Sequence, residues 1–149
     1  MPQVPAAEFA LQPGERLFFV YGTLRAGGSN DIRRLSPSPR FVANGRVRGR
    51  LYHLGAYPGL VLGGEAWVRG EVYAVQPQLE AVLDAIEEVW PQRSGEYLRR
   101  QAMVRLDAPP ASLCCLLYEL HPAHARGRAP MACGDWIAAC ASADFTSEK

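Results

Sequence analysis

The chain has 149 residues, of which 48% are hydrophobic and 21% are charged, and its formal net charge is +1. This length suits one domain with its own hydrophobic core, and the near-neutral charge gives no general attraction to nucleic acid or to an anionic membrane. No apolar run approaches membrane-spanning length, and the first residues lack the basic-then-apolar order of a signal peptide. We therefore expect a cytoplasmic protein with no nucleic-acid partner and no membrane partner.

The chain contains four cysteines and three histidines. The cysteines are Cys114, Cys115, Cys133 and Cys140. They form no C-x-x-C pair, and among the histidines only His121 and His124 lie near each other in the sequence. A zinc site needs closely spaced pairs of ligands. We therefore expect buried free thiols that behave as small hydrophobic side chains, with no metal site and no cofactor.

The start of the chain divides into a lead-in and a first strand. Residues 1–15 contain three prolines and little periodicity. We expect a mobile lead-in over 1–15, a single domain over 16–141 and a C-terminal tail over 142–149. The first strand is expected from Arg16 to Tyr21, because a continuous apolar and aromatic run suits a strand that is buried on both faces.

Gly22 ends this apolar run, and Thr23 follows it. Because glycine has no Cβ, the backbone at Gly22 can approach a ligand closely. Backbone N–H groups at such a turn can also cradle a carboxylate or a phosphate. The alternative is an ordinary strand that ends in a turn, and this stretch alone favours that alternative.

The rest of the chain reads mainly as strands. In chain order we expect a helical turn over 31–35 capped by Asn30, a strand over 41–54 bent at Asn44–Gly45, a turn over 55–59, strands over 60–62, 67–75, 97–106 and 113–120, a loop over 122–130 and a closing helix over 137–141. Gly49 and Gly70 lie in the middle of strands, which indicates the tight bends of a closed or strongly curled sheet.

Three arginines, Arg46, Arg48 and Arg50, alternate with small or apolar residues and so share one face of the long strand. Charged side chains that alternate along one strand usually form a solvated surface, and we expect that here rather than an anion site. A scaffold protein that binds partners through this face is a further alternative, and retention on an anionic matrix that depends on salt would test it.

Only the segment 77–90 has the period of an amphipathic helix. Pro77 suits its first residue, and Pro91 would close it. The apolar stripe consists of Leu79, Val82, Leu83, Ile86 and Trp90. Glu87 falls roughly 85° from the centre of this stripe, on the border between core and solvent. Partial burial there would raise the pKa of the carboxyl group towards neutrality, as a general base requires, although a solvated helix glutamate remains the alternative.

Two motifs stand out along the chain. The first is F-V-Y-G-T-L-R over 19–25, followed by Gly28 and Asn30, and the second is L-D-A-I-E over 83–87, followed by Tyr97 and Arg99. With them the chain resembles the gamma-glutamylcyclotransferase-like (AIG2-like) family. Weaker matches are G-E-V-Y over 70–73, Tyr118, and G-D-W over 134–136. The motifs occur in the order of the family. The chain departs from it at Asp31, where relatives often have histidine, and at Glu88, where they commonly have glycine.

The resemblance implies the fold, the reaction and the site. The fold class would be α+β, a small curled mixed β-barrel with one main amphipathic helix and short flanking helices. The reaction would be the intramolecular aminolysis of a gamma-glutamyl amide, which releases 5-oxoproline without a metal, with Glu87 as the acid/base. The residues implied for substrate binding are Tyr21, Gly22, Thr23, Leu24, Tyr97 and Tyr118.

Asp135 and Trp136 are expected to close the barrel end. An alternative function is a non-catalytic module on the same barrel that binds a small carboxylate or a peptide end. The gamma-glutamyl substrate and the oligomeric state are left open by the sequence.

Overall fold

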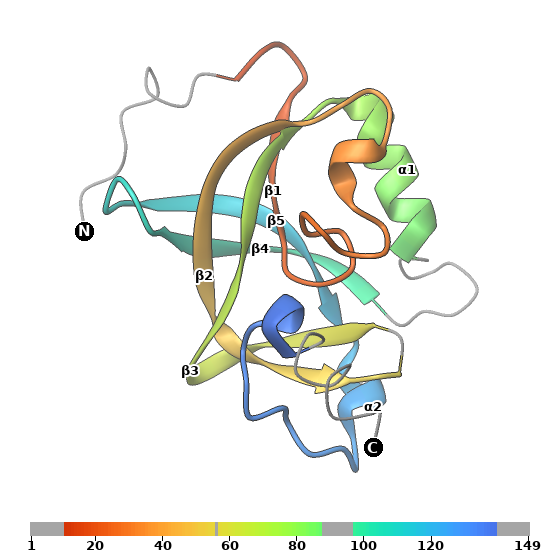
Figure 1. Cartoon of the computed structure of the whole chain (residues 1–149), viewed down its shortest axis with the longest axis vertical. Coiled ribbons are helices and arrows are strands. Elements are labelled where there is room, and N and C mark those ends of the chain that lie inside the picture. Colours follow the sequence, from red (N-terminus) through yellow and green to blue (C-terminus); the bar gives the residue numbers. More distant parts are fainter. Residues whose placement is uncertain (1–10, 56, 88–96, 140–149) are drawn as a thin grey trace.

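The computed structural model describes residues 11–55, 57–87 and 97–139, without the side chain of Glu87 (Figure 1). The elements are β1 (Arg16–Val20), the 3-10 helix η2 (Ile32–Arg34), β2 (Arg40–His53), β3 (Pro58–Val75), α1 (Pro77–Glu87), β4 (Tyr97–Leu106), β5 (Ser112–Leu120) and α2 (Pro122–Ala125). Within these ranges, no helix combines the length and the apolar character needed to cross a membrane.

The five strands form a closed barrel in the order β1-β3-β2-β4-β5. Neighbouring strands are antiparallel except where β5 meets β1 and β3, which it pairs in parallel. The barrel is therefore mixed, and Figure 1 shows β2 and β3 as long curved strands that run through its whole height. The predicted α+β class and the curled mixed barrel are confirmed.

The β2–β3 pair differs from the prediction in two places. The register shifts between Phe41 and Ala43 and between Arg48 and Gly49, and not at Asn44–Gly45. The segments 60–62 and 67–75 belong to one strand, β3, because the pairing resumes after residues 63–66. Gly63 and Gly64 have positive φ angles of 111° and 81°, so this irregular stretch reads as a turn in the sequence although the strand continues.

Two buried clusters explain why β1 is apolar on both faces. One cluster fills the barrel and draws on all five strands, as Phe19, Val47, Val68, Val104 and Leu117 illustrate. The other lies between the outer face of β1 and the helix α1 and consists of Phe18, Val20, Leu24, Ile32, Tyr73, Val75, Leu79, Leu83, Tyr97, Tyr118 and Leu120. Successive residues of a strand point to opposite faces, so β1 contributes alternately to both clusters.

Helix α1 begins at Pro77 as predicted. Leu79 and Leu83 are completely buried, but Val82 is 36% exposed and lies outside the contact face. The buried face of α1 is therefore narrower than the apolar stripe that the sequence predicts. Residues 88–90 of the predicted helix, including Trp90, lie outside the described residues.

The two ends of the domain also differ from the prediction. The segment 122–130, predicted as a loop, contains the short helix α2. The closing helix is observed at 136–139, and Trp136 is 4% exposed in the barrel cluster, as expected for a residue that closes the barrel. At the other end, Glu15 is buried and accepts hydrogen bonds from Arg40, so the last residues of the expected lead-in are attached to β2.

Candidate functional site

The loop that follows β1, residues 22–31, is called the signature loop below. Its carbonyl groups are used internally: Gly22 O accepts from Arg25 N at 3.0 Å, Thr23 O from Asn30 N at 2.9 Å, and Leu24 O from Ile32 N at 2.9 Å. By contrast, in the described part of the chain no acceptor is bonded to the N–H groups of Gly22, Thr23 and Leu24. These three successive residues, of which Gly22 and Leu24 are buried, thus carry backbone donors without an acceptor among the described residues. Successive donors of this kind are suited to an anion or a developing oxyanion.

Arg25 anchors the signature loop to the barrel. Its Nε donates to Glu71 Oε2 at 2.9 Å, and its Nη1 donates to Asp135 Oδ1 at 2.7 Å. Glu71 also accepts from Ala26 N at 2.9 Å and from the hydroxyl group of Tyr73 at 3.0 Å. Burial and the neighbouring Glu71 carboxylate raise the pKa of Tyr73 above its ordinary value. The motifs around 19–25, 70–73 and 134–136 thus meet at one arginine.

Asp31, and not Asn30, caps the helical turn. Its carboxylate accepts from Gly27 N at 2.9 Å and from Arg33 N at 3.0 Å, and Arg33 also pairs with it through its side chain. The hydrogen bond from the Arg33 side chain, opposed by burial and assisted by the two backbone donors, holds the pKa of Asp31 far below its ordinary value. The residue that departs from the family pattern therefore has a structural role in the loop.

The turn between β2 and β3 packs against Gly22. A Cβ at Gly22 would lie 2.7 Å from Pro58 Cγ and 2.9 Å from Pro58 Cδ, and Gly22 has no positive φ. The sequence analysis offered close approach of a ligand as one reason for glycine at position 22. In the structure, the Pro58 ring occupies the space that a Cβ at this position would need. The carbonyl oxygen of Pro58 also accepts a hydrogen bond from the Tyr97 hydroxyl group at 2.8 Å.

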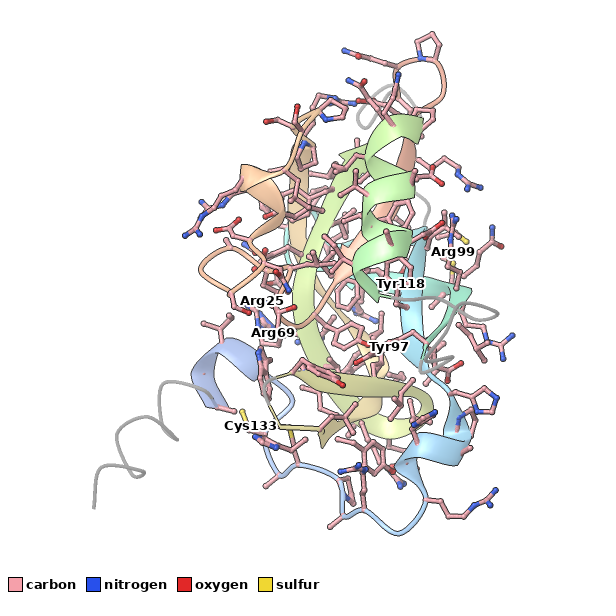
Figure 2. The ribbon with its side chains drawn as sticks, turned by 90° about the vertical axis from the view of Figure 1, so that its right-hand side faces the viewer. Arg25, Arg69, Tyr97, Arg99, Tyr118 and Cys133 are labelled. Carbon is pink, nitrogen blue, oxygen red and sulfur yellow. The ribbon has the colours of Figure 1, made fainter. Side chains whose placement is uncertain are left out.

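The hydroxyl groups of the three predicted site tyrosines bond within the chain. Tyr21 donates to Tyr118 O at 2.6 Å and accepts from Leu60 N at 3.2 Å. Tyr118 donates to Asp84 Oδ1 at 2.6 Å, which ties β5 to α1. Tyr97 and Tyr118 share a buried cluster with Leu24, while the Tyr21 ring belongs to the barrel interior. Figure 2 shows Tyr118 near the lower end of α1, with Tyr97 below it.

Ion pairs fix α1 to two further strands. Arg16 from β1 donates to both carboxylate oxygens of Glu80 at 2.8 and 2.7 Å. Arg99 from β4 bridges Glu80 Oε1 and Asp84 Oδ2, each at 3.0 Å. The hydrogen bond from Arg16 lowers the pKa of Glu80, burial opposes this, and Arg99 lowers it further. Glu80 and Asp84 are four residues apart and so lie on one face of the helix.

The predicted catalytic residue, Glu87, is the last described residue of α1, three positions after Asp84. Its side chain lies outside the described residues, as does Glu88, so the proposed role of Glu87 stays a prediction. Thr23 and Leu24 lie in the signature loop, where Thr23 is half-buried and Leu24 as a whole is only 4% exposed, so the Leu24 side chain is part of the core and is no ligand contact. The described part thus brings Gly22, Leu24, Tyr97 and Tyr118 together around Pro58 and α1.

The described cysteines differ in their exposure. Cys114 and Cys133 are exposed free thiols, Cys115 is buried, and Cys140 lies outside the described residues. The expectation of buried thiols is therefore wrong for Cys114 and Cys133, while burial raises the pKa of Cys115 to about 12. Within 11–55, 57–87 and 97–139, no three His, Cys, Asp or Glu side chains are grouped so that they could hold a metal ion.

Comparison with known families gives a match to "Gamma-glutamyl cyclotransferase, AIG2-like" over residues 18–138. The chain belongs to this family. The match includes the signature loop, α1, Tyr97, Tyr118 and the G-D-W segment. The resemblance stated from the motifs is therefore confirmed.

Individual members of the gamma-glutamyl cyclotransferase family are also similar to the chain. A Vibrio cholerae protein named "Putative gamma-glutamylcyclotransferase" is 44% identical over 75 residues, which cover 50% of this chain and 64% of the relative. The match therefore spans less than two thirds of that protein.

Solved structures agree on the fold. The crystal structure of an AIG2-like protein from Mus musculus has a TM-score of 0.61 and 28% identity, covering 70% of this chain and 76% of the mouse chain. YkqA from Bacillus subtilis has a TM-score of 0.66 and 23% identity, covering 91% of this chain but only 43% of YkqA. At that identity, YkqA supports the fold alone.

The sequence did not single out two residues of this gamma-glutamyl cyclotransferase-like chain that contact the predicted site residues, Asp84 and Pro58. Asp84 is part of the L-D-A-I-E motif and precedes Glu87 by three residues. Because residues three apart are neighbours on a helix surface, this spacing could have predicted that Asp84 lies beside Glu87. Pro58 had no such signal, because its neighbours Gly22 and Tyr97 are each more than thirty residues away in the sequence.

Proposed function

We propose that this protein is a gamma-glutamyl cyclotransferase-type enzyme that converts a gamma-glutamyl amide into 5-oxoproline and a free amine or amino acid. Membership of the family and the name of the Vibrio cholerae relative support this class of activity. The structural observation that carries the proposal is the set of free N–H groups at Gly22, Thr23 and Leu24, in a loop that packs in one cluster with Tyr118 and α1.

The proposed reaction needs no nucleophile from the protein. The α-amine of the gamma-glutamyl group attacks its own γ-carbonyl carbon, a C–N bond forms, and the carbonyl oxygen becomes an oxyanion. The original amide C–N bond then breaks, and the leaving nitrogen takes up a proton. In this mechanism the enzyme holds the substrate folded for attack, which supplies proximity and orientation.

Glu87 is the proposed proton carrier. It would accept a proton from the α-ammonium group, which frees the amine for attack, and return one to the leaving amine. The N–H groups of the signature loop would bind the oxyanion or the substrate α-carboxylate. Tyr21, Tyr97 and Tyr118 are proposed to line the substrate site, and Tyr118 also holds Asp84 one turn before Glu87. The proposed reaction uses no metal and no cofactor.

The decisive experiment is a panel of gamma-glutamyl dipeptides, glutathione and gamma-glutamylamines, with 5-oxoproline measured directly. Glu87→Gln should abolish turnover while leaving the melting temperature nearly unchanged. Glu88→Gln is the matched control and should retain activity. An inactive Glu88 variant beside an active Glu87 variant would show that the wrong glutamate was chosen.

The alternative, a non-catalytic binding module, makes a different prediction. In that case no member of the panel yields 5-oxoproline, while a non-cyclisable glutamyl analogue still binds. Treatment with EDTA tests the metal-free mechanism in the same assay. Loss of activity that one specific metal restores would overturn that part of the proposal.

A further inference from the structure

We propose a binding site for a small phosphate-bearing ligand on the outer surface of the barrel. It is formed by the arginine row, Arg69 of β3, Arg46 of β2 and Arg105 of β4. In the strand register, Arg46 lies directly opposite Arg69 on one neighbouring strand and directly opposite Arg105 on the other. Directly paired residues project to the same face with Cβ atoms about 5 Å apart, and like charges placed in this way destabilise a sheet.

The described carboxylates balance only part of this charge. Arg69 pairs with Asp107 at 2.7 Å, across side chains that are 42% and 36% exposed. Among the described residues, neither Arg46 nor Arg105 forms an ion pair. The row therefore holds more positive charge than its neighbours neutralise, and an anion of more than one charge would relieve the repulsion.

Besides this excess of positive charge, Arg46 has an unsatisfied hydrogen-bond donor. Its Nε is buried and has no hydrogen-bond acceptor among the described residues. A buried donor without an acceptor is costly and uncommon in native proteins. Because this nitrogen has almost no accessible surface, a ligand would bind through the exposed guanidinium groups of Arg69 and Arg105, and its negative charge would offset that of Arg46 beside them.

Trp67 stacks against Arg46 of the row and against Arg48, which lies outside it. The guanidinium carbon of Arg46 lies 4.7 Å from the centroid of the Trp67 ring, and that of Arg48 lies 3.9 Å from it. Arg48 also donates to Glu65 O at 2.6 Å. Stacked guanidinium groups lose less freedom when they bind, and their planar donors match the oxygens of phosphate in pairs.

These observations change the interpretation of this face. The sequence shows Arg46, Arg48 and Arg50 along one strand, where a solvated surface is the ordinary outcome. The fold adds Arg69 and Arg105 across three strands, and this convergence favours an anion site. The near-neutral chain favours a small ligand over nucleic acid. The site uses none of the proposed catalytic residues, and in Figure 2 Arg69 lies to the left of Tyr97 and Tyr118.

The test is thermal unfolding of the full chain in increasing inorganic pyrophosphate, with sodium chloride adjusted to hold the ionic strength constant. Saturating pyrophosphate should raise the melting temperature by about 2–5 °C, because a ligand that binds only the folded state stabilises it. An equal rise with chloride alone would overturn the site. A short single-stranded oligonucleotide that binds far more tightly than pyrophosphate would overturn the assignment to a small ligand.

Arg105→Gln separates a ligand site from an ordinary surface arginine. Without pyrophosphate this variant should melt slightly higher than the wild type, because a repulsive charge is removed, and its pyrophosphate affinity should fall about tenfold. Arg105→Lys should keep part of the affinity. Arg50→Gln is the matched control, since Arg50 pairs with Val61 outside the row. An equal loss of affinity in Arg50→Gln and Arg105→Gln would contradict the proposal.

Discussion

The signature loop and the helix α1 are both fastened by arginines, but in different environments. Arg25, Glu71 and Asp135, which hold the loop, have side chains that are 13%, 6% and 27% exposed. On the helix side, Glu80 is 11% exposed, but its partners Arg16 and Arg99 are 52% and 25% exposed, and Asp84 is 33% exposed. Removing one partner of a buried pair leaves an uncompensated charge, whereas exposed pairs contribute little. The loop should therefore depend on its ion pairs, and the helix mainly on its buried leucines.

The largest effect is expected from Glu71→Ala. This change removes the acceptor for Arg25, for Ala26 N and for the Tyr73 hydroxyl group. We expect a loss of about 3–5 kcal/mol in the free energy of unfolding, measured by urea denaturation. Glu65→Ala, at an exposed position of the same strand, is the control and should change stability by less than about 0.5 kcal/mol. Similar losses in both variants would contradict the contrast between buried and exposed carboxylates.

Gly22→Ala tests the packing of the loop against the β2–β3 turn. The added Cβ would overlap Pro58, so we expect a loss of about 1–3 kcal/mol in stability. Thr23→Ala adds no atom near Pro58 and should be milder. The double variant Gly22→Ala with Pro58→Ala should recover part of the loss, which a double-mutant cycle by urea denaturation measures. Strictly additive losses would show that the two residues are not in conflict.

Tyr118→Phe tests whether the bond to Asp84 positions the helix for catalysis. Removing a hydrogen bond to a carboxylate should cost about 1.5–3 kcal/mol of stability. If the bond also positions Glu87, kcat should fall roughly tenfold while KM changes little. Tyr52→Phe is the control, because the Tyr52 hydroxyl bonds to no described residue. An unchanged kcat in Tyr118→Phe would leave this bond a purely structural role.

The smallest effect is expected from Arg16→Gln, at the exposed end of the helix network. Above the ordinary pKa of 4.5 for Glu80, the loss should stay below about 1 kcal/mol. The pKa of Glu80 is lowered in the folded state, so its contribution is complete above 4.5 and disappears as the pH falls through the lowered value. Urea denaturation at pH 7 and at pH 3 should therefore show a difference between variant and wild type that shrinks in acid. A difference that grows in acid would contradict this assignment.

Local patterns in the sequence predicted most elements. The alternation in 97–106, the apolar run after Arg16 and the helical period after Pro77 each report on their own segment, and all three elements were found. Asp31 was missed as the cap because Asn30 is an equally good capping residue. Val82 was assigned to the core because periodicity gives the direction of a side chain but does not give the width of the surface that covers it.

The sequence by itself determined the strand and helix periods, the family motifs and their order, and hence the barrel class and the choice of Glu87 as the candidate acid/base. Only the tertiary structure decided that Pro58 occupies the space beside Gly22, that Arg25 joins Glu71 to Asp135, and that Arg46 stands between Arg69 and Arg105. The physical reason is sequence distance. These contacts join residues that are tens of positions apart, and the closure of the barrel sets the register that brings them together.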